Sequence, residues 1–253
     1  LCTCISIFFL TLNILPDVLT YEKISNDFEL SPLSITLEFK IDVLSVIFLL
    51  LLSFIKIVIL FYYRTDIEKY LGEENRKIFY CVYLLHLFSL IGIFTTNNLL
   101  NLFLFFEIYA FSFFANLSIS RDSKISKISF KYFCLNTSSS LLILFSFLAL
   151  YLSLGEVNLD KIRENLYLIN AQNEWFLIAI FLLLTIAFVI KFVPFWLYFE
   201  NLKSTTLIAD FLAIDSIFIK TNIGIYITLR FFYFFFDNNP IIAEINFAPT
   251  LIL

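Results

Sequence analysis

The sequence has few of the residues that tight turns, metal sites and cofactor sites require. Its 253 residues include 4 Gly, 5 Pro, one His and no Met. So few glycines and prolines exclude a membrane barrel of many short strands joined by turns. The single histidine excludes haem held between two axial histidines, and there is no Gly-rich phosphate loop. We therefore expect neither a cofactor nor a metal.

The cysteines do not change this expectation. Cys2, Cys4, Cys81 and Cys134 all lie in apolar segments, where a thiol behaves as a small hydrophobic group. One close pair, Cys2 and Cys4, is too little for a metal site. The absence of Met, together with an apolar run that begins in the last residues, PTLIL, predicts that the chain is a fragment of a longer protein.

Apolar residues are what the sequence has in excess. They make up 60% of the chain, Phe alone occurs 34 times, and the mean hydropathy is +0.91. An ordinary soluble domain is only about half apolar. Long apolar runs of this kind form helices that satisfy their own backbone hydrogen bonds in lipid. The predicted fold is an all-α, multi-pass helix bundle, with residues 1–253 as a single transmembrane domain in the bilayer. The net charge of −4 argues neither for nor against nucleic acid, and we expect no nucleic-acid partner.

Hydropathy divides the chain into one partial and six full membrane spans, since a span needs about 20 mostly apolar residues. Only Asn97 separates the third segment from the fourth, so these two should form a tight hairpin. The predicted segments are 1–15, 43–63, 78–96, 98–119, 132–154, 175–198 and 209–236.

Basic residues alternate between the two sides of these spans. Because cytoplasmic loops carry an excess of Lys and Arg, the loops that follow 43–63, 98–119 and 175–198 are predicted to be cytoplasmic. These loops hold Arg64, Lys69, Arg76, Lys77, Arg121, Lys124, Lys127, Lys131 and Lys203, against Lys23, Lys40, Lys161 and Arg163 on the other side.

Glu107 is the most unusual residue in these spans. It is near the middle of 98–119, too deep for its short side chain to reach either membrane surface. A charge at this depth costs about 2.5–3.5 kcal/mol on insertion scales, so it needs a partner or a function. Glu107 is either an acid that exchanges protons or a protonated structural acid hydrogen-bonded between helices.

Lys220 is a second charge near the middle of the membrane, twelfth in the segment 209–236. Thr221, Asn222 and Gly224 follow it and could provide polar room around the amine. A lysine so placed can release its proton or hold a partner of opposite charge. The alternative is that its side chain extends to the surface, which is a long reach from this depth.

Lys191 stands three residues before Pro194. A proline inside a helix removes a hydrogen bond and kinks the helix, which frees carbonyl groups beside the charge. We therefore expect a broken helix near Pro194. Because Lys191 lies past the middle of its span, position alone leaves open whether it has a function or extends to the surface.

Three further residues are weaker candidates. His86 could relay protons, although a lone histidine in an apolar helix is often only structural. Lys56 lies two turns from Arg64, and we expect its side chain to extend to the surface. Asp215 precedes Lys220 by five residues, which places the two on different faces of a regular helix.

Five segments together resemble one family of membrane proteins. They are FKIDVLSVIFLLL (39–51), NLFLFFEIYAF (101–111), KYFCLNTSSSLLIL (131–144), VIKFVPFWL (189–197) and IKTNIGIYITLR (219–230). In order and spacing they resemble the antiporter-like subunits shared by respiratory complex I and Mrp-type cation/proton antiporters, and most of all the Mrp D subunit. The segment with the glutamate is the most specific match.

The resemblance implies a fold, a function and a location. It implies two inverted five-helix repeats, of which 78–236 would be the first. Carried over position by position, proton translocation would pass through Glu107, Lys191 and Lys220. From their places in the sequence, we add Pro194, His86, Asp215 and Asn222 as candidate supporting residues. The protein would be a subunit of a multisubunit Na⁺(K⁺)/H⁺ antiporter in the bacterial inner membrane, beside other membrane subunits and without a cofactor.

The sequence leaves three alternatives open. The first is a proton-pumping subunit of NADH:quinone oxidoreductase or a related hydrogenase, which would make the chain part of an enzyme complex. The second is a purely structural membrane subunit, and the third is an unrelated secondary transporter. The family usually places its proline about two residues farther from the lysine than Pro194 is from Lys191.

Overall fold

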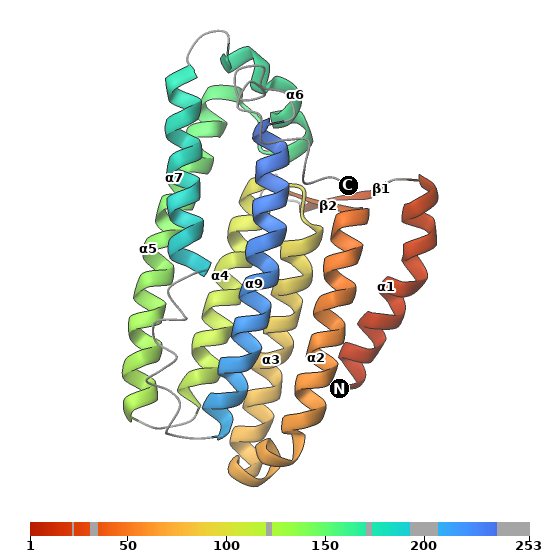
Figure 1. Ribbon diagram of the computed structural model, residues 1–253, viewed down its shortest axis with the longest axis vertical. Helices are drawn as coiled ribbons and strands as arrows, with labels where there is room; N and C mark the ends of the chain where they lie inside the picture. Colours follow the sequence, from red (N-terminus) through yellow and green to blue (C-terminus); the bar gives the residue numbers. More distant parts are fainter. Residues whose placement is uncertain (22, 31–34, 120–122, 171–173, 193–206, 237–253) are drawn as a thin grey trace.

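Most of the molecule is a bundle of long helices whose axes are roughly aligned and whose directions differ from helix to helix (Figure 1). The computed structural model describes residues 1–21, 23–30, 35–119, 123–170, 174–192 and 207–236. Its long helices are α1 (Cys2–Tyr21), α2 (Val43–Tyr70), α3 (Glu73–Thr95), α4 (Leu99–Ser118), α5 (Ser123–Leu154), α7 (Glu174–Phe192) and α9 (Leu207–Phe236).

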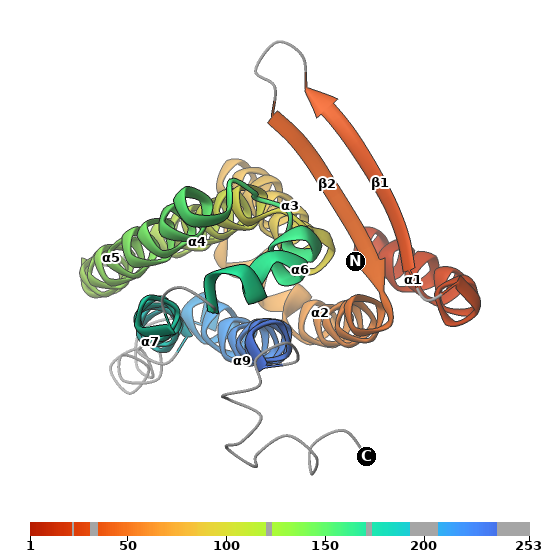
Figure 2. The ribbon, with the colours of Figure 1, turned by 90° about the horizontal axis from the view of Figure 1, so that it is seen from above.

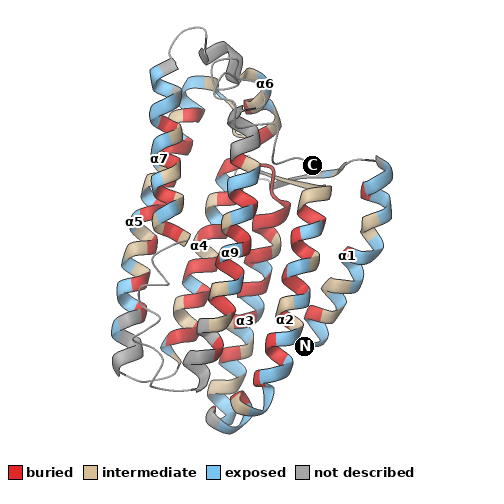
Figure 3. Cartoon of the chain, in the orientation of Figure 1, coloured by how far each residue is buried: buried red, intermediate tan, exposed pale blue. Residues whose placement is uncertain are grey.

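The described helices have the length and polarity of membrane spans. Five of them, α1 to α5, are long and apolar enough to cross a membrane, and α7 adds a shorter apolar stretch, Ile178–Phe192. Buried side chains line the inside of the bundle and exposed ones cover the outside (Figure 3). Many of the exposed side chains are large and apolar, such as Phe61 and Leu152, which suits contact with lipid rather than water. The prediction of a multi-pass helical membrane protein is confirmed.

Several helices extend beyond their predicted spans, and α2 and α5 do so by the most residues. We expected α2 to end at residue 63, but it continues to Tyr70. There Arg64 donates a hydrogen bond to Glu68 at 3.1 Å, a pair one turn apart that supports a helix in a polar environment. Helix α5 likewise begins at Ser123 instead of 132, so several basic residues assigned to loops lie in helical turns.

A β-hairpin that the sequence analysis did not predict joins α1 to α2. Strand β1 (Lys23–Leu30) pairs with β2 (Ile35–Asp42) in antiparallel register, with Lys23 opposite Asp42. Seen from above, the hairpin extends beside the bundle, away from α5 and α7 (Figure 2). Asp42 then caps α2 by accepting a hydrogen bond from the Ser45 backbone N–H at 2.8 Å.

A short helix, α6 (Leu159–Asn170), lies at the same end of the bundle as the hairpin (Figure 1). The sequence analysis treated it as part of a loop. Lys40 of β2 donates hydrogen bonds to both carboxylate oxygens of Asp160, the shorter at 2.6 Å, and so ties the hairpin to α6. The turn after α2 and the C-terminal end of α4 lie at the opposite end (Figure 1), which agrees with the alternation of loops predicted from the spans.

Helices α3 and α4 form the expected tight hairpin. At Gly92 the helices approach so closely that a Cβ atom would overlap the ring of Phe105, so only glycine fits. The turn itself is bound by other segments: the Asn97 N–H donates to Glu38 O of β2 at 3.0 Å, and the Leu159 N–H donates to Asn97 O at 2.9 Å.

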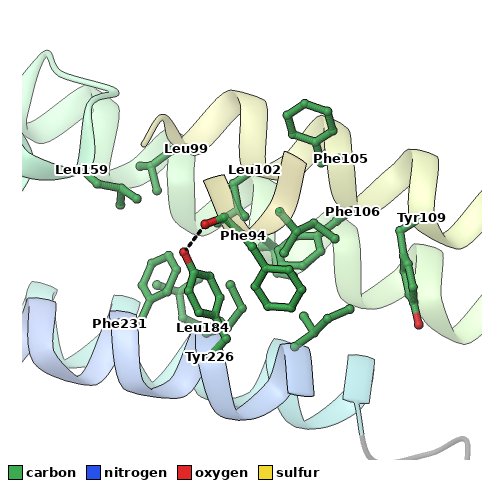
Figure 4. Close-up of a cluster of buried hydrophobic side chains, with 14 of the residues drawn as sticks. Phe94, Leu99, Leu102, Phe105, Phe106, Tyr109, Leu159, Leu184, Tyr226 and Phe231 are labelled. Atoms are coloured by element: carbon green, nitrogen blue, oxygen red, sulfur yellow. Dashed lines mark hydrogen bonds between the residues drawn. The ribbon is translucent and has the colours of Figure 1, made fainter. Parts of the chain in front are cut away.

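The core at the hairpin end combines aliphatic and aromatic side chains and includes part of α9. Phe94 of α3 and Phe106 of α4 pack beside Tyr226 of α9, whose hydroxyl donates a hydrogen bond to Phe94 O at 2.8 Å (Figure 4). From above, α9 lies between α2 and α7 (Figure 2). Polar residues of α9 are thereby brought next to α2 on one side and next to α4, α5 and α7 on the other.

Candidate functional site

Glu107 and Lys191 meet inside the bundle. Lys191 is in the last turn of α7, and its Nζ lies 3.8 Å from Oε1 of Glu107, which is in the middle of α4. The two side chains differ in burial: Lys191 is 2% exposed and Glu107 is 35% exposed. The two residues that the resemblance pairs are therefore close enough to interact electrostatically.

A serine takes the closer hydrogen bond from Lys191. The Lys191 ammonium donates to Ser140 Oγ of α5 at 2.6 Å and also lies 5.0 Å from the centre of the Phe106 ring. Helices α4, α5 and α7 thus all contribute to one cation. Because the hydroxyl and the ring hold the ammonium, Lys191 does not need a tight bond to Glu107 in order to stay buried.

Lys220 is buried in α9 on the other side of this group. Its Nζ lies 3.9 Å from the centre of the Tyr132 ring and 5.9 Å from that of Phe113, so aromatic faces surround the amine. Its charge interacts with that of Lys191. Two like charges in a medium of low dielectric constant oppose each other, so the protonation of one lysine affects the other.

The residues predicted to support proton translocation lie in different places, and one of them is outside the described residues. Asn222 is buried on α9, two residues after Lys220. Pro194 lies outside the described residues, and so does the helix break expected there. Asp215 is buried on α9 and contacts a helix other than the ones that hold Glu107 and Lys191.

His86 is held in one orientation by α4. The Ser112 hydroxyl donates to Tyr109 O at 2.9 Å, so it is the acceptor in its 3.1 Å contact with His86 Nδ1. The proton of the neutral imidazole is therefore on Nδ1, and Nε2 keeps its lone pair. Nε2 is buried without a hydrogen-bond partner among the described residues, and the ring stacks on Tyr109 at 4.8 Å.

The expectation for Lys56 was wrong. Its side chain does not extend to the surface: it is fully buried in the middle of α2, and its Nζ lies 2.7 Å from Oδ2 of Asp215. The depth of Lys56 in a 28-residue helix was the signal that could have found this site. The partner is 159 residues away in sequence, which the spacing of local residues cannot reveal.

The buried charges form one group across five helices. Among the described residues, three cations, two acids and one histidine lie inside the bundle, and none of these residues forms a cluster suited to a metal ion. Such groups can pass protons, because each charge changes the protonation of its neighbours. The members are Lys56 of α2, His86 of α3, Glu107 of α4, Lys191 of α7, and Asp215 and Lys220 of α9.

Comparison with known protein families agrees with this arrangement. Residues 96–252, well over half of the chain, match the family described as NADH:quinone oxidoreductase/Mrp antiporter, transmembrane. The chain belongs to this family. Family membership confirms the resemblance and removes the alternative of an unrelated secondary transporter.

One curated member of the family matches most of this chain. The chain is 27% identical over 214 residues to the D subunit of the Na⁺/H⁺ antiporter of Alkalihalophilus pseudofirmus, a match that covers 84% of this chain and 41% of that protein. It spans between a fifth and about two fifths of the length of the curated relatives it matches.

Two solved structures share the fold. A chain of the Mrp complex from a Dietzia species superposes with a TM-score of 0.72 and 19% identity, over 92% of this chain and 25% of that chain. A chain of an archaeal respiratory complex, the membrane-bound sulfane sulfur reductase, superposes with a TM-score of 0.69 and 18% identity, over 90% of this chain and 35% of that chain.

Proposed function

We propose that the chain is a proton-translocating part of a membrane subunit in a multisubunit Na⁺(K⁺)/H⁺ antiporter. The observation that carries the proposal is the contact of Glu107 with Lys191, in which the lysine is held mainly by Ser140. An ion pair of this kind can open and close without leaving the lysine unsupported. The similarity to the D subunit of a Na⁺/H⁺ antiporter supports the same function.

The proposed mechanism is electrostatic. While Glu107 is ionised, it balances the charge of Lys191. When Glu107 takes up a proton, the balance is lost, and the charge of Lys191 acts more strongly on Lys220. Repulsion then favours release of the proton from Lys220. Loss of a proton from Glu107 and uptake of a proton by Lys220 restore the starting state, so protons move in steps past Glu107, Lys191 and Lys220.

Orientation and partners belong to the same proposal. The excess of basic residues favours a cytoplasmic position for the turns after α2 and α4 and for the segment between α7 and α9. The opposite end, with the hairpin and α6, would face the outside of a bacterial inner membrane. The chain would assemble with other membrane subunits of the antiporter, and residues 78–236 would form the first five-helix repeat.

The test is antiport by the whole subunit in its complex after Glu107→Gln. Vesicles containing the complex are energised, Na⁺ or K⁺ is added, and proton movement is followed with a fluorescent pH indicator. We expect the substitution to lower the initial rate by roughly a hundredfold or more, since a positioned proton carrier is lost. Glu68→Gln, which removes an exposed acid of α2, is the matched control. Wild-type rates for Glu107→Gln at every pH would contradict the proposal and favour a purely structural subunit.

A second candidate function is a proton-pumping subunit of NADH:quinone oxidoreductase or a related respiratory complex. The likeness to a chain of an archaeal respiratory membrane complex favours it. The two functions are distinguished by the partners that purify with the intact protein. Small antiporter subunits support the first, whereas iron–sulfur and quinone-reducing subunits support the second.

A further inference from the structure

The ion pair between Lys56 and Asp215 has no part in the mechanism proposed above. It joins α2 to α9 at 2.7 Å, and its side chains are 0% and 1% exposed. A buried ion pair often stabilises a protein no more than apolar residues of the same volume would. In a bundle that is otherwise rich in Phe, Leu and Ile, stability alone is a weak reason for such a pair.

The pair can accept a proton without coming apart. Lys56 bonds to Oδ2 of Asp215, while Oδ1 is buried with no hydrogen-bond partner among the described residues. The ring of Tyr83 also lies against Lys56, with Nζ 4.4 Å from its centre. If Oδ1 gains a proton, the ring and the remaining hydrogen bond still support the lysine charge. The pair thus has both a site for a proton and a means of tolerating it.

His86 connects this pair to Lys220. Its ring is 6.2 Å from that of Tyr83, which contacts Lys56, and 6.2 Å from that of Phe113, which contacts Lys220. The charges of both lysines act on the imidazole. Its Nε2 atom holds a free lone pair, as argued from the Ser112 hydrogen bonds. His86 is therefore near both cations and has an atom able to accept a proton.

We propose that Lys56 and Asp215 form a second proton-exchange site, which His86 connects to Lys220. In the first step Lys220 transfers a proton to His86 Nε2, leaving a neutral amine and an imidazolium. In the second step the imidazolium transfers a proton to Asp215 Oδ1, leaving a neutral imidazole and a neutral acid, while Lys56 keeps its charge. The other titratable groups that act on the pair or on His86 are Cys4 of α1, Tyr83 of α3 and Tyr109 of α4.

This inference rests on the proposed function, so its test uses the same antiport measurement on the whole complex. The decisive variant carries Lys56→Gln and Asp215→Asn together. It removes both charges, leaves no buried charge unpaired, and keeps two side chains that can hydrogen-bond. The matched control is Arg64→Gln with Glu68→Gln, which neutralises an exposed ion pair on the same helix. Assembly of each variant is checked first by the amount of intact complex recovered.

We expect the buried double variant to assemble and to lose roughly tenfold or more of the initial antiport rate, with an altered pH profile, while the control keeps both. Wild-type rates at every pH in the assembled buried variant would overturn the inference. If that variant fails to assemble, His86→Gln decides, because it keeps a donor for Ser112 but cannot carry a proton. A lower rate and shifted pH profile support the inference, and unchanged values overturn it.

Comparing the buried double variant with Glu107→Gln separates a failure of the second proton-exchange site from a failure of the proposed function. If Glu107→Gln abolishes antiport and the buried double variant does not change it, only the second site fails. If Glu107→Gln leaves antiport unchanged, the proposed function itself fails.

Discussion

Two ion pairs inside this bundle differ in almost every physical respect. Glu107 and Lys191 are 3.8 Å apart, and the acid is about one third exposed, whereas Lys56 and Asp215 are 2.7 Å apart and fully buried. Lys191 donates its shortest hydrogen bond to a third helix, while Lys56 donates its own to its acidic partner. The first pair can therefore respond to a proton by separating. The second can respond only by a change of protonation in place.

The largest expected effect comes from removing one charge of the tight pair. Lys56→Gln alone leaves Asp215 buried without its counter-charge, which should lower the free energy of unfolding of the protein in detergent by about 3–5 kcal/mol. Lys40→Gln is the control, because the Lys40 and Asp160 pair is partly exposed and should contribute about 1 kcal/mol or less. Equal losses in the two variants would show that burial does not distinguish these pairs.

A smaller effect is expected at the loose pair. Ser140→Ala removes the 2.6 Å hydrogen bond from Lys191, and a bond to a charged group contributes about 1.5–3 kcal/mol. Antiport should slow as well, because the ammonium then depends more on Glu107 and the pair opens less readily. Ser140→Thr keeps the hydroxyl and is the control. If unfolding and antiport are the same in both variants, the serine does not hold the lysine.

The smallest effect concerns the ring beside Lys56. Tyr83→Leu removes the cation–π contact at 4.4 Å and should lower the free energy of unfolding by about 1–2 kcal/mol. Tyr83→Phe keeps the ring and should cost almost nothing, since the hydroxyl has no hydrogen-bond partner among the described residues. A larger loss with Phe than with Leu would contradict the assigned role of the ring.

The charged residues show where sequence reasoning succeeds and where it stops. The depth of Glu107 in an apolar run was enough to single it out, because a buried charge is costly wherever it occurs. Its contact with Lys191 was expected only from the family resemblance. The partner of Lys56 could not be predicted, because contacts between distant helices depend on how the bundle packs and leave no trace in local spacing.

The β-hairpin was missed even though the sequence carries a local signal for it. Residues 35–42 alternate apolar and polar side chains, the pattern of a half-exposed strand, so the signal for β2 was present. Long apolar runs, which identify membrane spans, do not reveal such a strand, because half of its side chains are polar. The helix ends were also misplaced, because a search for apolar residues stops where charged turns such as that of Arg64 and Glu68 continue the helix.

The turn between α3 and α4 is bound by backbone hydrogen bonds to β2 and to the start of α6, through Asn97 and its neighbours. These bonds fix one end of the two helices, so the turn acts as a pivot and any tilting moves their far ends most. A tilt of about 3° displaces the far end of a helix roughly 30 Å long by about 1.5 Å. Glu107 lies about half-way along α4, so it would move by about half as much. A small rocking motion would therefore change the distance between Glu107 and Lys191 by a fraction of an ångström, while the hairpin end of the helices stayed still.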